Sequence, residues 1–449
     1  MRALLVLFFA FFVGCATNPV THRPELSFLS VSGEKKIGKQ VVLTVSKEDL
    51  SQGPFITKGF AVDYLQRIVN RFMPYYERRD EMPVAVQISP TAVPNAWAVP
   101  GYITVNLGLI PCLESEAQLA FVLGHELGHI AARHTAERYT QSVLLSLGLQ
   151  GVNIYAGNLA ALVGNVAATL YIATYSRSQE RMADDLGFRY MSLAGYNPEE
   201  AYRAMYSIER CGNEYMKLLG IKKVSGIAGF FERLFADHPS TQERIKRLKL
   251  KAEALGKRGG VEEYYDFSRL KRWAHVRKKV LVKLDRAYQL LKKHREDEAR
   301  KEIESAVSKV KSNRFEPEIK AKVYSFAGYL FLLDKDYEKA WSYALKAVEF
   351  KRDYYVSYKI AGIAGLRDES YEGLEVAYNA FSDCLEEKMS DVDYRMVLGR
   401  RAAVDKVCLK GALIASCKLG YHKRCRAYCK SYYKVFGRLT PDVIRYCVY

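Results

Sequence analysis

Residues 125–129 read HELGH, and they lie in a stretch from Ser115 to Arg133 in which apolar side chains recur every three or four positions. This period predicts a helix, and Ser115 suits its N-cap. On a helix, the imidazoles of His125 and His129 project from the same face, because they are four residues apart. Two neutral imidazoles in that arrangement can hold one zinc ion.

The glutamate that follows the first histidine can act as a general base in catalysis. A catalytic zinc site has three protein ligands and an open position, and Glu126 flanks that position. Its carboxylate can accept a proton from zinc-activated water and pass it to the leaving amine, while zinc polarises the scissile carbonyl. The motif therefore indicates peptide-bond hydrolysis, provided that a third ligand lies elsewhere in the chain.

The third ligand must come from outside the motif. In metzincins it is a histidine six residues further on, but Thr135 stands there and Ala132 replaces the required glycine, so that class is excluded. A glutamate on a later helix is the other common solution. Glu180 offers one, and Asp184, one turn on, could accept the free N–H of a ligand histidine. The alternative for Glu180 is a solvent-facing acid beside two arginines.

The surrounding sequence predicts a mostly helical α+β domain with a small sheet. Two runs rich in β-forming residues, Val84 to Ile88 and Tyr102 to Asn106, lie between proline and glycine turn signals. Ile103 to Leu107 is expected to be an edge strand that pairs with extended substrates, so Val105→Pro should raise the Michaelis constant. Further helices are expected at residues 60–75, 179–193, 198–209 and 239–254.

Residues 139–176 contain no charged side chain. Asparagines and glycines interrupt the stretch, so it holds no clean span of about 20 apolar residues. We expect a buried or membrane-facing helical hairpin there. A membrane-embedded peptidase that uses this stretch as spans is the alternative.

The N-terminus is typical of an exported protein. Residues 1–14 carry an early arginine and then the apolar run Ala3 to Val13, which is too short to span a bilayer, and they are assigned as a signal peptide. Residues 12–15, FVGC, resemble the lipobox of bacterial lipoproteins, in which cleavage leaves an acylated cysteine. Cys15 is therefore the expected lipidation site and residues 15–32 the lipidated tether, with an ordinary secretory signal as the alternative. The expected location is the periplasm, on the inner leaflet of the outer membrane.

The second half of the chain reads as a separate helical domain. A glycine-rich basic break near residues 255–260 ends the zinc metallopeptidase domain expected at residues 33–255. Residues 261–449 are expected to form an all-α domain. Small and aromatic residues in 324–347 match the spacing of a tetratricopeptide repeat, and residues 358–371 continue it in register.

Cysteines and charge add two further constraints. Eight cysteines remain after Cys15, six of them in the last 66 residues, and export favours disulfides among them. A metal site from Cys417, His422, Cys425 and Cys429 is the alternative, but its spacing matches no familiar zinc finger. The net charge of +18 suits anionic lipids, acidic clients or solvated helix faces. Export makes nucleic acid an unsuitable partner.

Four motifs in order carry a family resemblance. They are residues 95–101 (NAWAVPG), 125–134 (HELGHIAARH), 176–184 (SRSQERMAD) and 238–240 (HPS). Together they resemble one gluzincin family of zinc metallopeptidases, which includes the HtpX heat-shock protease, the CAAX prenyl protease and Oma-type members. The likeness covers roughly residues 15–250 and extends to the periplasmic lipoproteins of BepA type, which carry C-terminal tetratricopeptide repeats.

The resemblance implies a gluzincin peptidase fold with one zinc ion per chain. By this likeness His125, His129 and Glu180 are the metal ligands and Glu126 is the catalytic base. Tyr102 stands where the family usually has a second glycine, which leaves the turn before that strand undefined but does not touch the metal site.

His238 has two interpretations. Pro239 suits a first helical turn, and Ser240 with Glu243 forms a plausible capping pair, which would give His238 a role in helix initiation. The resemblance instead implies a position near zinc, where His238 could donate to the oxyanion or occupy the open metal position. We favour the second interpretation, as a candidate catalytic residue. His134 lies off the ligand face and is expected to pack or to form a hydrogen bond.

These observations predict a zinc-dependent endopeptidase that acts on misfolded or stalled envelope proteins in protein quality control. Expected partners are unfolded or misassembled envelope proteins, the membrane through the lipid anchor, and outer-membrane assembly machinery through the repeat domain. The alternative is a chaperone-like or scaffold lipoprotein in which the repeat domain binds clients and proteolysis is minor.

Overall fold

The computed structural model describes residues 14–150, 175–221, 242–256, 259–261, 265–312, 314–398 and 404–447. These residues are mostly helical and include a three-stranded sheet and a two-stranded hairpin, which confirms the predicted fold class. Residues 1–13 of the predicted signal peptide, His238 and residues 151–174 of the uncharged stretch lie outside the described residues. Among the helices described, none is both long and apolar enough to cross a bilayer.

Packing divides the chain into two compact units. The first comprises Met1–Val42, Ile56–Ile88 and Val93–His275, and the second comprises Leu43–Phe55, Ser89–Ala92 and Val276–Tyr449. The division near residue 275 falls inside helix α11 (Tyr265–Lys292). The bounds predicted near residues 255 and 261 concern sequence modules rather than packing, and they stay a prediction.

The three-stranded sheet has the order β3-β5-β4, with β3 at Ala85–Ser89, β5 at Tyr102–Asn106 and β4 at Ala96–Val99. Strands β4 and β5 form an antiparallel hairpin around Gly101, whose φ of 86° favours glycine. Because β5 is the central strand, the expectation that Ile103 to Leu107 forms an edge strand is wrong. The edge strands are β3 and β4. The sequence did not predict β4, because prolines lie just before and just after it.

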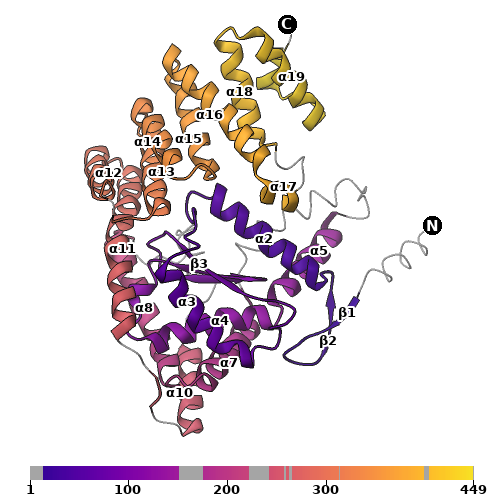
Figure 1. Cartoon of the computed structure of the whole chain (residues 1–449), viewed down its shortest axis with the longest axis vertical. Helices are drawn as coiled ribbons and strands as arrows, with labels where there is room; N and C mark the ends of the chain where they lie inside the picture. Colours follow the sequence, from indigo (N-terminus) through magenta and orange to yellow (C-terminus); the bar gives the residue numbers. More distant parts are fainter. Residues whose placement is uncertain are drawn as a thin grey trace, which may run out of the picture. The chain divides into compact units, whose positions relative to one another are not determined.

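The helices predicted for the first unit are present with shifted ends. Helix α4 (Glu116–Ala131) begins at Ser115, whose side chain accepts a hydrogen bond from the backbone N–H of Gln118. The disulfide Cys112–Cys211 joins the short 3-10 helix η2 (Ile110–Cys112) to helix α8 (Glu200–Leu218). The other helices, several of which are labelled in Figure 1, are α3 (Phe60–Phe72), α5 (His134–Gln150), α7 (Arg177–Leu193), α8 (Glu200–Leu218) and α10 (Gln242–Leu255).

The N-terminal residues expected to form a tether are folded. Strands β1 (Gly14–Thr17) and β2 (Pro24–Ser27) pair as an antiparallel hairpin, and helix α2 (Val31–Glu48) follows. Polar side chains in and after this hairpin form hydrogen bonds with residues of the first unit. These hydrogen bonds hold the short polar segment in place.

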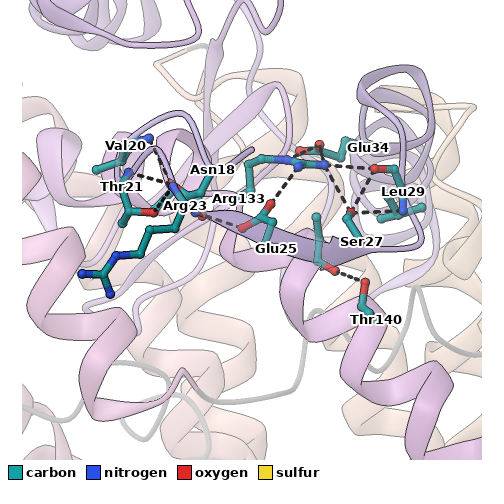
Figure 2. A network of polar contacts seen from close by, with 12 residues as sticks. Asn18, Val20, Thr21, Arg23, Glu25, Ser27, Leu29, Glu34, Arg133 and Thr140 are labelled. Atoms are coloured by element: carbon teal, nitrogen blue, oxygen red, sulfur yellow. Dashed lines mark hydrogen bonds and ion pairs between the residues drawn. The ribbon is translucent and has the colours of Figure 1, made fainter. Parts of the chain in front are cut away.

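Arg133 lies at the centre of the polar network that holds the hairpin (Figure 2). Its guanidinium donates to the carboxylates of Glu25 at 2.7 Å and Glu34 at 2.9 Å. The side chain of Asn18 donates to the carbonyl of Ala132, just past the end of α4, at 3.0 Å. Arg133 itself has a φ of 59°, a left-handed conformation that commonly ends a helix. The hairpin is therefore bonded to the residues that directly follow the HELGH helix.

The second unit consists of helices in consecutive pairs (Figure 1). A Cβ on Gly328 would lie 2.8 Å from the carbonyl of Ala340, so the small residues let the paired helices approach closely. The tetratricopeptide assignment itself stays a prediction. The helices are α12 (Glu296–Val310), α13 (Pro317–Leu333), α14 (Tyr337–Phe350), α15 (Tyr355–Asp368), α16 (Tyr371–Ser390), α17 (Val392–Leu398), α18 (Lys406–Lys418), α19 (His422–Phe436) and α20 (Pro441–Cys447).

The cysteines of the second unit form disulfides. The bridges are Cys384–Cys408, Cys417–Cys425 and Cys429–Cys447. The three cysteines of the alternative metal site are all used in these bridges, so their thiolates are not available to an ion.

Residues 43–55, which belong to the predicted peptidase segment of the sequence, pack within the second unit. Glu48 accepts from Lys388 at 2.6 Å and from Lys359 at 2.7 Å. Asp405 contacts the same two ammonium groups at 2.7 and 2.6 Å. We call these four residues the Glu48 cluster. Because the side chain of Lys388 is only 1% exposed, the cluster is a buried electrostatic tie rather than a surface pair.

Candidate metal centre

Glycines let helices α4 and α7 cross at close range. A Cβ on Gly187 would lie 2.7 Å from the backbone nitrogen of His125, and one on Gly124 would lie 3.1 Å from the Cα of Gly187. Larger residues at these positions would force the two helices apart. The close crossing brings Glu180 and Asp184, both on α7, up to the histidines of α4.

The structure brings the three predicted metal ligands together at this crossing. The ligand atoms of His125, His129 and Glu180 all lie within 4.8 Å of one another. The two histidine Nε2 atoms are 3.1 Å apart, and the Glu180 oxygens lie 3.6 and 3.5 Å from them. All three residues are buried, with at most 5% of their surface exposed. Within the part of the chain that the structure describes, this is the one cluster with a metal-ligand composition.

Asp184 and Arg244 hold two of the ligands in orientation. Asp184 Oδ1 lies 3.1 Å from Nδ1 of His125, and Arg244 donates to both Asp184 oxygens at 2.7 and 2.8 Å. The Arg244 guanidinium also lies 2.8 Å from Glu180 Oε2. Burial works against ionisation of Asp184, but the hydrogen bonds from Arg244 and His125 outweigh it and hold its pKa below the ordinary value. Asp184 therefore stays a carboxylate that can accept the His125 Nδ1 proton.

His129 is oriented from its other side by His134 and Tyr175. The Nδ1 atoms of His129 and His134 are 2.8 Å apart, close enough for one to donate to the other. Burial lowers the pKa of His134 to about 3, so this ring is neutral near pH 7. The ring of Tyr175 stacks on His129 with centroids 3.8 Å apart. His134 thus forms a hydrogen bond to a ligand and is not itself in the ligand cluster.

The donor set fits a zinc ion. Burial lowers the pKa of His129, which favours the neutral imidazole that metals require. When the Nδ1 atoms of His125 and His129 donate to Asp184 and His134, the two Nε2 lone pairs face each other and the Glu180 carboxylate. Convergent lone pairs need a cation between them, and two imidazoles with one carboxylate are a known catalytic zinc set.

The other predicted site residues have different outcomes. Glu126 is buried on α4 beside His125, with 2% of its surface exposed. Burial acts to lower the pKa of Arg244, but the carboxylates of Asp184, Glu180 and Glu126 together raise it above its ordinary value. Glu126 is therefore close enough to interact electrostatically with Arg244. His238 lies outside the described residues, and its role stays a prediction, as does lipidation of Cys15.

Sequence reasoning missed Arg244 and Tyr175. Arg244 lies in a helix rich in lysine and arginine, which reads as a solvated surface. The helical spacing could have revealed it, because Arg244 lies on the same face of α10 as the apolar residues Ile245 and Leu248, and that face is buried. A cation on an apolar face requires a buried acid as partner, and the pair Glu180 and Asp184 was available.

Comparison with known proteins agrees with this geometry. The family model described as peptidase family M48 matches residues 61–252. A protease HtpX homolog of Pyrococcus furiosus is 31% identical over 202 residues, which are 38% of this chain and 68% of that protein. The chain belongs to peptidase family M48. The gluzincin family expected from the four motifs is thereby confirmed.

Two further M48 relatives resemble the chain over a similar region. The mitochondrial metalloendopeptidase OMA1 of Schizosaccharomyces pombe is 26% identical over 238 residues, which are 51% of this chain and 64% of that protein. The metalloprotease YcaL of Escherichia coli is 25% identical over 175 residues, which are 37% and 61% of the two chains. The chain spans less than two thirds of the OMA1 relatives that it matches. The first unit is thus an M48 metallopeptidase domain, a class that uses zinc, and the convergent ligands form its candidate site.

Proposed function

We propose that this protein is a zinc-dependent endopeptidase that cuts unfolded or misassembled proteins of the bacterial envelope. The observation that carries the proposal is the convergence of His125, His129 and Glu180 inside an M48 domain. Protein quality control is the setting that suits an enzyme which requires extended substrates.

The residues around the site divide the chemical work. Zinc, when bound, supplies the Lewis acid that polarises the scissile carbonyl and acidifies the attacking water. Glu126 accepts the proton from that water and returns it to the leaving amine. Asp184 and Arg244 keep His125 and Glu180 in their binding orientation. His238 is proposed to act near the same position as a donor to the developing oxyanion.

The edge strand β4 is the proposed docking strand for the substrate backbone. Asn106 donates to the carbonyl of Asn95, and hydrogen-bonded pairs alternate along an antiparallel ladder, so Ala96 and Ala98 turn their N–H groups away from β5. No strand in the described part of the chain pairs with that side of β4. Main-chain pairing selects an extended conformation rather than a sequence. This supports a broad range of unfolded substrates.

The second unit is proposed to present clients or to dock on outer-membrane assembly machinery. Stacked helix pairs offer extended surfaces of the kind that bind protein segments. Part of this unit is already engaged by the chain itself, because Lys322 donates to the Leu50 carbonyl and Tyr354 donates to the Gly53 carbonyl at 3.0 Å. Clients would therefore bind the helices away from residues 43–55.

A lipid anchor at Cys15 and a periplasmic location on the inner leaflet of the outer membrane belong to the same proposal. The FVGC stretch at residues 12–15 supports it. Replacing Cys15 by Ser should release the protein into the soluble periplasmic fraction. Retention of that variant in the membrane fraction would favour a membrane-embedded peptidase.

One experiment tests metal, activity and base together. Purified protein is assayed for zinc content and for cleavage of an unfolded, reduced protein, with and without a chelator. The Glu126→Gln variant should keep the metal, because Glu126 is not a ligand, and should lose cleavage by at least about a hundredfold. Intact cellular function in this variant, with loss on alteration of the repeat helices, would instead support the chaperone-like alternative.

A further inference from the structure

Half of the net charge of the chain lies near its C-terminus. Residues 406–447 contain ten lysine and arginine side chains against a single acid, Asp442, which is a net charge of +9 out of +18 for the whole chain. These residues form helices α18, α19 and α20 of the second unit. The excess charge is therefore local, and nothing in the proposed peptidase chemistry uses it.

Four of these cations share one face of helix α19. Lys423, Arg426, Lys430 and Lys434 follow one another at intervals of three, four and four residues. At 3.6 residues per turn they fall within an arc of about 80° and extend over about 16 Å of helix axis. All four side chains are exposed. We call these residues the cation stripe.

Among the residues that the structure describes, no acid forms an ion pair with the cation stripe. The ion pairs that the described residues make around α19 are Lys410 with Asp442 and Lys418 with Glu369, and neither involves the stripe. Like charges at these spacings destabilise an isolated helix. A counter-charge from a binding partner would relieve the mutual repulsion of these four cations.

The opposite face of α19 is fixed to the rest of the unit. Cys425 and Tyr432 are buried on that face, with 9% and 0% of their surface exposed. The disulfides Cys417–Cys425 and Cys429–Cys447 join the helix to its neighbours on both sides in the sequence. Because two disulfides and a buried face hold α19 in the second unit, the stripe is presented on the outer side of a fixed helix.

We propose that the cation stripe is an electrostatic docking surface for anionic phospholipid headgroups of a bilayer. Three of its four members are lysines, whose compact ammonium groups contact phosphates without the directional fork of arginine. A straight, exposed row suits a flat anionic surface, and clustered cations of this kind attract such surfaces. Tyr433, 60% exposed, lies beside the stripe, and tyrosine favours the headgroup region. The proposal is independent of the peptidase activity and of any acyl chain.

The test measures binding to vesicles in the absence of an acyl chain. The full-length chain carrying Cys15→Ser is mixed with vesicles of phosphatidylcholine alone or with about 30% phosphatidylglycerol, and bound protein is measured by sedimentation. The stripe variant is K423Q/R426Q/K430Q/K434Q. The matched control is K35Q/K36Q/K246Q/K249Q, which removes the same charge from four exposed lysines of the first unit.

The expected result is binding to the anionic vesicles only, weakened at least about tenfold in the stripe variant and unchanged in the control. About 0.5 M salt should abolish it, because the Debye length falls to a few ångströms. Equal binding by the stripe variant would overturn the proposal. So would stripe-dependent binding of polyglutamate without vesicle binding, which would assign the surface to acidic polypeptides. Thermal unfolding of both variants, expected within a few degrees of the parent, shows that each is folded.

Discussion

Gly187 lies directly against the backbone of His125, so that a Cβ at Gly187 would come within 2.7 Å of the His125 nitrogen and 3.0 Å of its Cα. Gly187→Ala should therefore push α7 away from α4 and move Glu180 from the histidines. We expect a loss of about 1–3 kcal/mol in the free energy of unfolding from overpacking. We also expect zinc affinity to fall at least about tenfold, as when the surroundings of a metal ligand are disturbed.

Zinc titration and chemical denaturation measure these two effects. Leu193→Ala, at the exposed end of the same helix, is the control and should leave both quantities unchanged. Full zinc affinity in the Gly187→Ala protein would show that the crossing distance does not set the ligand geometry.

Arg244 is expected to act on the metal through the residues that it holds. Arg244→Gln removes the donor to Asp184 and the charge beside Glu180, and should weaken zinc binding by about 10–100-fold. Lys251→Gln, which breaks only the exposed pair with Asp185, should bind zinc like the parent. Competition with a zinc chelator measures both affinities, and equal values would remove Arg244 from the positioning role.

The Glu48 cluster makes an acid-dependent contribution to stability. Burial alone would raise the pKa of Glu48. The ammonium groups of Lys388 and Lys359 have a larger effect in the opposite direction and hold this pKa below its usual value of 4.5. A carboxylate with a lowered pKa stabilises the fold above its unfolded-state pKa, and this stabilisation is lost as the pH falls toward the folded-state pKa. The parent should therefore lose stability steeply between about pH 5 and 3.

Glu48→Gln should flatten this acid dependence and cost about 3–5 kcal/mol near neutral pH, because two lysines lose a buried partner. Urea unfolding at several pH values tests both expectations. Glu349→Gln is the control, since its pair with Lys346 is exposed. An acid slope that is identical in the parent and in Glu48→Gln would show that other carboxylates govern the transition.

Substrate docking on β4 can be tested at Ala98. Ala98→Pro removes an N–H that points away from β5, so the hydrogen bonds between β4 and β5 are kept. KM for an unfolded substrate should rise about tenfold with little change in kcat, corresponding to roughly one lost hydrogen bond. Ala98→Gly keeps the N–H and is the matched control. Val105→Pro, on the central strand, should instead destabilise the sheet, because that position lies between two strands.

Most of the correct predictions from the sequence rest on local patterns, such as helical periodicity and capping residues. The apolar period from Ser115 onward and the Ser115 cap define α4, so the shared face of His125 and His129 follows from helix geometry alone. Glu180 could be nominated because glutamate on a later helix is a known third ligand. Its place against the histidines depends on Gly124 and Gly187, whose role appears only when two helices are packed together.

What the sequence could not provide involves partners distant in the chain. Strand β4 escaped notice because proline normally marks a turn, and four residues are too few to show alternation. Arg244 resembled a solvated cation because its acids lie 60 or more residues earlier. The same holds for Glu48, whose lysines come from residues 359 and 388.

The network around Arg133 and Asn18 sets a limit on where the enzyme can work. With a lipid on Cys15, as proposed, only the backbone from Cys15 to Asn18 separates the acyl chains from a residue bonded to the end of the HELGH helix. Fully extended, those residues reach about 10 Å. The catalytic centre would then act within a thin layer of solvent next to the bilayer. Proteins that stay in this layer for long would become its substrates.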